Sequence, residues 1–212
     1  HSVTVAAEGV AQALTSEDWS TVETLLLKVI RGCLETCLLA SKTWDFPVDA
    51  PYLKAAQKVR RRTPYMPTWG NGSAAKTCEE AKAHWKQAKA KEKEMKLSEA
   101  SIAAAWMDDV GGKLSLLWVV HDLVALCPWT SSMDAGSLMK YMQEECEETT
   151  AEMAALRTRA FGGRSWTQVV ADLVAELGDV QFTLLLSLYI IARDSNVSPV
   201  GLIRTLTSRV CK

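Results

Sequence analysis

The order of apolar and polar residues predicts helices along most of the chain. Apolar residues recur every three or four positions, the spacing that gathers them on one face of an α-helix. The clearest such stripe lies in the C-terminal third, at Leu173, Leu177, Val180, Leu184 and Leu188. We find no convincing run of the alternating residues that mark a half-buried strand. We therefore expect an all-α protein in which antiparallel neighbours are joined by short turns.

Capping residues indicate where these helices begin. Thr77 with Glu80, and Ser165 with Gln168, fit the capping-box pattern, and Ser16 is the expected N-cap of an earlier helix. The predicted helices cover residues 16–41, 49–62, 77–96, 114–126, 137–159, 165–193 and 198–212. The helix over residues 77–96 is rich in lysine and glutamate, so we expect it to be a solvated outer helix or arm.

Composition narrows the class of protein. The chain has 212 residues and a formal net charge of −1, which suits one domain or two small ones and gives no reason to expect a nucleic-acid-binding protein. The longest apolar run, residues 180–192, is too short to cross a bilayer, and no signal peptide is visible, so we expect no membrane association. The six cysteines include no Cys-x-x-Cys pair, so we expect reduced thiols in a cytoplasmic protein.

Two groups of carboxylates carry the candidate chemistry. They are Glu144, Glu145 and Glu148 on one predicted helix, and Glu176 and Asp179 on the next. Spacings of three or four residues place carboxylates on one helix face. Facing carboxylates repel one another unless a cation offsets their charge, and Mg²⁺ prefers such oxygen ligands. The pattern therefore predicts a Mg²⁺ site between the two helices.

Simpler interpretations of both groups stay open. The run of glutamates from Glu144 to Glu148 is also compatible with a solvated helix surface. Gly178, between Glu176 and Asp179, weakens a helix interior and allows either a ligand or a neighbouring helix to approach closely.

The spacing of the acids resembles a known signature. Glu144-Glu145-x-x-Glu148, followed after 27 residues by Glu176-x-x-Asp179, is similar to the signature of the MazG-type all-α nucleoside triphosphate pyrophosphohydrolases. The family implies hydrolysis of a nucleoside triphosphate to the monophosphate and pyrophosphate with Mg²⁺. Carried over residue by residue, it implies Glu145, Glu148, Glu176 and Asp179 as metal ligands. Glu144 would hold a second metal or the attacking water, so Glu144, Glu145 and Glu148 are the candidate catalytic residues.

Neighbouring segments extend the resemblance over residues 127–212. Cys127-Pro128-Trp129 looks like the family's Cys-Pro-Trp segment, and residues 176–182 resemble its second metal-binding helix. Trp129 and Trp166 are candidates to stack on a base, although Trp129 is equally compatible with a core anchor and Trp166, in a capping position, fits a core anchor better.

The family also implies phosphate contacts from the last helix. Arg209 and Lys212 stand closest to the family's basic positions. Thr207-Ser208-Arg209 departs from the usual Asn-Glu-Lys pattern, and Leu186 stands where many members have Asn. These departures leave the substrate open.

The N-terminal part resembles the second half of another MazG unit. Residues 25–30 and 56–66 carry this similarity, but Ser20 and Glu23 replace the family's Glu and Asp, and a first acidic group is missing. We therefore expect a helical bundle of MazG type with tandem units, the N-terminal one incomplete. The predicted segments are an N-terminal unit over residues 1–75, a charged linker over 76–112 and a catalytic unit over 113–212.

The resemblance implies a house-cleaning enzyme that is a homodimer or pairs its two units within one chain. Two alternatives stay open. One is a related helical enzyme, a dimeric dUTPase or a phosphoribosyl-ATP pyrophosphatase. The other is a degenerate, non-catalytic binding or scaffold module.

Overall fold

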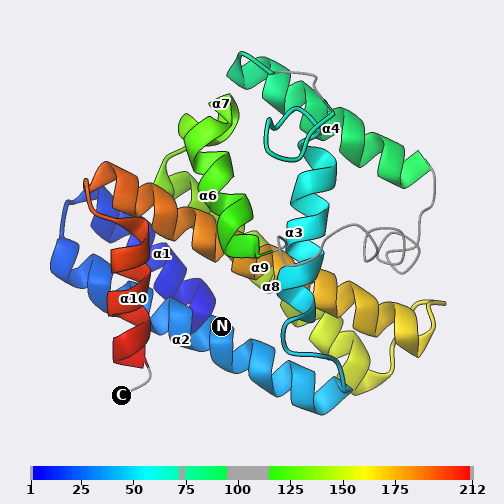
Figure 1. Ribbon diagram of the computed structural model, residues 1–212. Helices are drawn as coiled ribbons and strands as arrows, with labels where there is room; N and C mark the ends of the chain where they lie inside the picture. The colour runs from blue at the N-terminus through cyan, green and yellow to red at the C-terminus, as the bar shows by residue number, and fades with distance from the viewer. Residues whose placement is uncertain (1, 72–74, 95–114, 211–212) are drawn as a thin grey trace. The chain divides into compact units, whose positions relative to one another are not determined.

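A computed structural model describes residues 2–71, 75–94 and 115–210, and its regular secondary structure there is entirely helical (Figure 1). The all-α prediction is therefore confirmed for these residues. The helices are α1 (Ser2–Thr15), α2 (Trp19–Trp44), α3 (Ala50–Arg62), α4 (Cys78–Glu94), α6 (Leu116–Leu126), α7 (Pro128–Ser131), α8 (Ala135–Thr158), α9 (Trp166–Asp194) and α10 (Pro199–Val210).

The chain forms two compact units, which we call unit 1 (residues 1–51 and 134–212) and unit 2 (residues 52–133). Unit 1 therefore joins helices from both ends of the chain. The division into the three segments given above stays a prediction. The tandem MazG arrangement stays a prediction.

Unit 1 is a bundle in which α1 packs against α2 and α8, α8 packs against α9, and α10 lies across α2 and α9 (Figure 1). One of its core clusters consists of buried residues from three helices, namely Ala40, Trp44, Leu156, Val169, Leu173 and Leu177. Each fully buried aliphatic side chain of this kind contributes about 1.5–3 kcal/mol, so packing between helices holds this bundle together.

Helix α9 is the most buried helix of unit 1. Its start has the predicted capping box, in which Ser165 and Gln168 each bind the other's backbone N–H. All five residues of the predicted apolar stripe are buried. The helix is long and apolar enough to cross a membrane. However, 72 % of its most apolar 18-residue stretch is buried inside the structure, as expected of a bundle's central helix.

Unit 2 contains most of α3, the loop after it, α4, α6 and α7. The predicted capping box of α4 is confirmed, because Thr77 Oγ1 accepts from the Glu80 N–H and the Glu80 carboxylate accepts from the Thr77 N–H. The outer position predicted for α4 holds for most of its side chains, but Ala81 is fully buried.

Ionic contacts fasten α4 to the end of α3. Glu92 forms ion pairs of 2.6 Å with Arg61 and 2.8 Å with Arg62. The Arg62 guanidinium also lies 5.4 Å from the centre of the Trp85 ring, on the face where a cation is attracted.

The N-terminal helix boundary differs from the prediction. Helix α2 is capped by Asp18, which accepts from the Thr21 N–H at 3.2 Å, and not by Ser16. Ser16 instead donates its hydroxyl to the carbonyl oxygens of Gln12 and Ala13, because α1 ends there. Helix α1 itself was not predicted.

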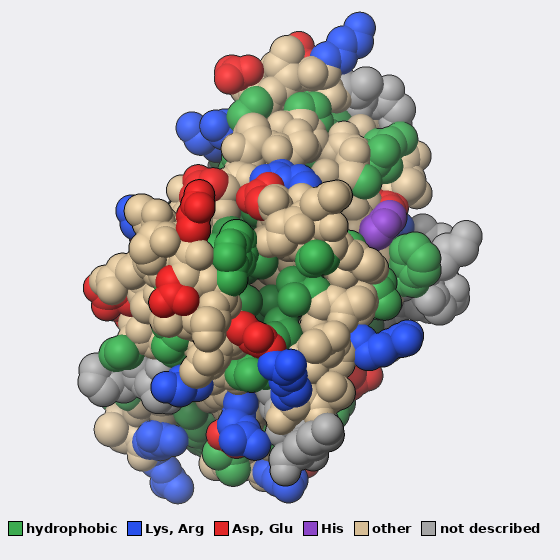
Figure 2. Space-filling view, turned by 90° about the vertical axis from the view of Figure 1, so that its left-hand side faces the viewer, with side chains coloured by type: hydrophobic (Ala, Val, Ile, Leu, Met, Phe, Trp, Pro, Cys, Tyr) green, Lys and Arg blue, Asp and Glu red, His purple; other side chains and the backbone are tan. Residues whose placement is uncertain are grey.

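Charges of both signs occur on the molecular surface. Figure 2 shows lysine, arginine, aspartate and glutamate side chains mingled with hydrophobic ones on the face in view. That face therefore carries charges of both signs, in keeping with the near-neutral net charge of the chain.

Candidate metal centre

The hairpin of α8 and α9 positions the acidic residues. Asp134 caps α8 by accepting from the Ser137 N–H at 2.8 Å, and its own pKa is lowered by the hydrogen bonds from Ser137. Arg164, in the turn, binds Glu152 of α8 at 2.8 Å and Asp172 of α9 at 2.7 Å. These contacts fix the two helices side by side, so carboxylates on their facing sides must approach one another.

Three carboxylates meet between these helices. Glu145 of α8 and Glu176 and Asp179 of α9 each place an oxygen atom within 4.8 Å of the other two. Asp179 is 9 % exposed, and the two glutamates are partly buried. Holding three ionised carboxylates at such distances raises the free energy of the folded state, because they repel one another. A bound divalent cation offsets this repulsion and so lowers the free energy again. Carboxylate oxygens from two helices, with partial access to solvent, fit a hard cation such as Mg²⁺ that keeps several waters.

The other two predicted acids lie outside this group. Glu144 and Glu148 are exposed side chains on α8. Neither belongs to the three-carboxylate group. Their predicted roles, in holding the attacking water and in metal binding, stay predictions.

A small cavity adjoins the same stretches of α8 and α9. It has a volume of about 70 Å³, and its lining includes Cys146 and Thr149 of α8, Leu177 and Val180 of α9, and Cys33 of α2. The volume is well below the several hundred Å³ of typical small-molecule sites, so it suits one or two waters and not a nucleobase.

The groups around this cavity are largely neutral. Burial raises the pKa of Cys33, and burial together with the carboxylates of Glu145 and Glu147 raises the pKa of Cys146 to about 11. The Thr149 hydroxyl is buried and has no hydrogen-bond partner among the described residues. Both thiols therefore stay protonated near neutral pH and do not add to the negative charge of the centre.

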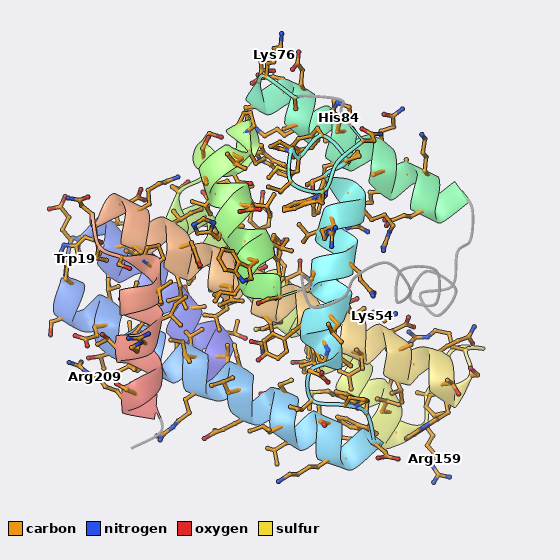
Figure 3. All side chains as sticks on the ribbon, viewed as in Figure 1. Trp19, Lys54, Lys76, His84, Arg159 and Arg209 are labelled. Atoms are coloured by element: carbon orange, nitrogen blue, oxygen red, sulfur yellow. The ribbon has the colours of Figure 1, made fainter. Side chains whose placement is uncertain are left out.

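The structure describes one of the two predicted phosphate-binding residues, Arg209. Arg209 forms an ion pair with Glu23 of α2, near the start of that helix, which Trp19 marks in Figure 3. This contact occupies the guanidinium with a protein carboxylate. Lys212 lies outside the described residues.

Trp129 belongs to unit 2, whereas the three carboxylates belong to unit 1. Its ring packs edge-to-face against Trp85, with centroids 5.7 Å apart. Cys127, in the same Cys-Pro-Trp segment, is buried beside the Tyr65 hydroxyl at 3.3 Å and caps α7. These contacts favour the interpretation of Trp129 as a core anchor, and its predicted contact with a base stays a prediction.

The structure also contains a pocket that the sequence patterns did not indicate. It lies in unit 2 and is lined by Arg60, Thr68, Trp69, Trp118, Val119 and Asp122. The two tryptophans and the lone arginine were visible in the sequence, but they lie on separate elements, so no local spacing connected them.

Comparison of the chain with protein-family models, with curated proteins and with solved structures found no match in any of the three.

Proposed function

We propose that this protein is a Mg²⁺-dependent nucleoside triphosphate pyrophosphohydrolase that converts (d)NTP to (d)NMP and pyrophosphate. The proposal rests on one observation above all, the three carboxylate oxygens of Glu145, Glu176 and Asp179 within 4.8 Å of one another. The spacing of the acids along the sequence, which resembles the MazG signature, supports the choice of reaction.

The roles of the residues follow from charge. Glu145, Glu176 and Asp179 would hold the metal, because hard divalent cations favour carboxylate oxygens. When bound, Mg²⁺ supplies charge neutralisation for the triphosphate. Glu144, exposed on α8, would orient a water and accept its proton as the water oxygen bonds to phosphorus and the bond to the pyrophosphate leaving group breaks. By the resemblance, Glu148 would be a further metal ligand.

The test is pyrophosphate release from a panel of nucleoside triphosphates with and without Mg²⁺. We expect Glu145→Gln, Glu176→Gln and Asp179→Asn each to lower kcat/KM by about 100-fold or more. Glu147→Gln is the matched control, since Glu147 is an exposed acid of the same helix outside the carboxylate group, and it should keep wild-type activity. Equal rates for the wild type and all three site variants would contradict the proposal.

The same panel separates the related enzymes. A dUTPase would hydrolyse dUTP far faster than other triphosphates, and a phosphoribosyl-ATP pyrophosphatase would act on phosphoribosyl-ATP. Either result would narrow the substrate while leaving the carboxylate roles unchanged.

A non-catalytic binding module is the second candidate. Two observations favour it, namely the exposure of Glu148 outside the carboxylate group and the ion pair that joins Arg209 to Glu23. Such a protein would bind a triphosphate with Mg²⁺ without releasing pyrophosphate, so binding measured by calorimetry in the absence of turnover would support it.

A further inference from the structure

The pocket of unit 2 has the composition of a ligand site. Its volume is about 330 Å³, at the lower end of the range for small-molecule sites. It combines two indole rings, one guanidinium and one carboxylate, supplied by Trp69, Trp118, Arg60 and Asp122. None of the three carboxylates of the candidate metal centre lines it.

Arg60 is set apart from its two neighbours. Arg61 and Arg62 share the carboxylate of Glu92, which offsets their charge. The Arg60 guanidinium instead lies 5.9 Å from the centre of the Trp69 ring. Its Nε atom is buried and has no hydrogen-bond partner among the residues that the structure describes. This atom is closed to solvent, so a ligand in the pocket meets Arg60 through the rest of its side chain.

The loop after α3 holds Trp69 in place. The Trp69 indole N–H lies 3.2 Å from both the carbonyl oxygen and the hydroxyl of Thr63. The turn that follows is tight, because a Cβ on Gly70 would lie 2.2 Å from the Pro64 carbonyl oxygen. The indole is therefore fixed before any ligand arrives, which lowers the entropy cost of binding.

Helix α6 supplies the opposite groups. Trp118 is 64 % exposed, an unusual position for so large an apolar ring, and contacts the His121 ring edge-to-face. Asp122 lies 3.2 Å from His121 Nδ1, and its side chain is 23 % exposed. The carboxylate disfavours a phosphate in this pocket, because two anions would repel. The ligand must therefore offer a donor group to Asp122.

These groups define a ligand chemistry. Indole rings stack on planar heteroaromatic rings, and they do so with little preference for one nucleobase over another. A guanidinium donates to the carbonyl oxygen or ring nitrogen of a base, and a carboxylate accepts from an exocyclic amino group. A planar ring that carries both an acceptor and an amino donor is an amino-bearing nucleobase, namely guanine, adenine or cytosine.

We propose that the pocket of unit 2 binds an amino-bearing nucleobase. The base stacks on the indole rings, accepts a hydrogen bond from the Arg60 guanidinium and donates its amino group to Asp122. The base belongs either to a free nucleotide or to single-stranded nucleic acid. The site does not depend on the function proposed for the three carboxylates.

The test is calorimetric titration of the full chain with nucleoside 5′-monophosphates in EDTA, which removes divalent metal and so leaves the metal centre out of the measurement. We expect GMP, AMP or CMP to bind at least about 10-fold more tightly than UMP, which lacks an amino group. Trp118→Ala, Asp122→Asn and Arg60→Gln should each weaken binding of the preferred nucleotide by about 10-fold or more. Circular dichroism checks that each variant is folded.

Two controls match these variants. Trp166→Ala removes another exposed tryptophan, in unit 1, and Glu147→Gln removes an exposed acid outside both candidate sites, so both should bind as the wild type does. Asp122→Asn provides a second readout, because the asparagine amide donates to uracil and should raise the affinity for UMP relative to the amino-bearing nucleotides. A variant that had merely lost structure would not reverse the preference.

A single-stranded oligonucleotide of the preferred base distinguishes the two sources of the base. Binding that is tighter than that of the monophosphate assigns the site to nucleic acid, and equal or weaker binding assigns it to a free nucleotide. The proposal is overturned if no monophosphate binds, if Trp118→Ala and Asp122→Asn both bind like the wild type, or if inorganic phosphate displaces the nucleotide.

Discussion

Asp179 is the most deeply buried of the three carboxylate residues of the metal centre. It is 9 % exposed and sits within 4.8 Å of the carboxylate oxygens of both Glu145 and Glu176. Screening by water is weakest for a buried charge, so its repulsion with the two glutamates is larger than for exposed acids at the same distance.

We expect Asp179→Asn to have opposite effects on stability with and without metal. Without divalent cations the variant should be as stable as the wild type or more stable, because one repelling charge is gone. Mg²⁺ at about 100 times its dissociation constant should stabilise the wild type by about 2.7 kcal/mol, and the variant far less. Thermal unfolding in EDTA and in Mg²⁺ measures both effects. A variant that Mg²⁺ stabilises as much as the wild type would show that the metal binds elsewhere.

Sequence periodicity predicted only part of this centre. It placed Glu176 and Asp179 on one face of a helix and Glu145 on the facing helix, and the structure brings these three together. It grouped Glu148 with them, whereas the structure leaves that side chain exposed. Periodicity gives the residues that share a face, but packing fixes the rotation of α8 against α9, through buried side chains such as Met142.

At the scale of elements, the α8–α9 turn contains several residues in the left-handed region. Arg159, at the tip of the hairpin in Figure 3, ends α8 with a φ of 56°. Gly162 and Gly163 follow with φ values of 57° and 86°. Only glycine adopts this region without strain, so Arg159 contributes strain that the two glycines avoid.

Substitutions in this turn should therefore act in opposite directions. Arg159→Gly should raise the free energy of unfolding by less than about 1 kcal/mol, since the left-handed C-terminal position of a helix favours glycine. Gly162→Ala should lower it by about 1–2 kcal/mol through backbone strain alone, because a Cβ there meets nothing within 4 Å. Urea denaturation measures both changes. A neutral Gly162→Ala would show that the left-handed backbone at this position is not strained by a side chain.

The ion pairs of Glu92 with Arg61 and Arg62, which join α4 to α3, should make the stability of unit 2 depend on pH. Burial opposes the charge of Glu92, but hydrogen bonds from Arg62 and Arg61 outweigh it and lower the pKa of this carboxyl. Because the folded pKa lies below the unfolded one, the contribution of Glu92 is fully present above about pH 4.5. It is lost as the pH falls through the folded pKa.

Glu92→Gln should reproduce that loss at neutral pH. It leaves two largely buried guanidinium groups without their counter-charge, which should cost about 2–4 kcal/mol. The control is Glu79→Gln, an exposed glutamate at the other end of α4. Denaturation of unit 2, followed by tryptophan fluorescence from pH 7 to pH 3, should show the variant's deficit shrinking with acid. A deficit that stays constant with pH would exclude the ion pairs as its cause.

Local signals explain which helices were predictable. The capping boxes at Thr77 and Ser165 involve residues three positions apart, so the sequence alone revealed them. Helix α1 escaped notice because its buried face consists mainly of alanines, which produce a weak apolar stripe. The buried residues of that face are Ala6, Ala7, Val10 and Ala13.

At the scale of the whole molecule, the chain folds into one discontinuous and one continuous unit. Unit 1 needs residues 1–51 to complete the bundle of α8 and α9, whereas unit 2 is a single stretch of the chain. The packing of α1 against α8 joins residues more than a hundred positions apart. No periodicity within a window of the sequence reports such a contact, so the division into units had to come from the structure.

The two candidate sites lie in different units. Amide hydrogen exchange, measured helix by helix, can therefore report ligand binding at each site separately. Mg²⁺ binding to Glu145, Glu176 and Asp179 should slow amide exchange in α8 and α9, because local opening of these helices would release the metal. Exchange in α6 should stay unchanged by Mg²⁺, and a nucleoside monophosphate in EDTA should slow it there instead. Mass spectrometry of peptides from each helix resolves the two responses. Equal slowing of α6 and α9 by Mg²⁺ alone would contradict a metal centre confined to unit 1, because a ligand protects most strongly the segments whose opening it prevents.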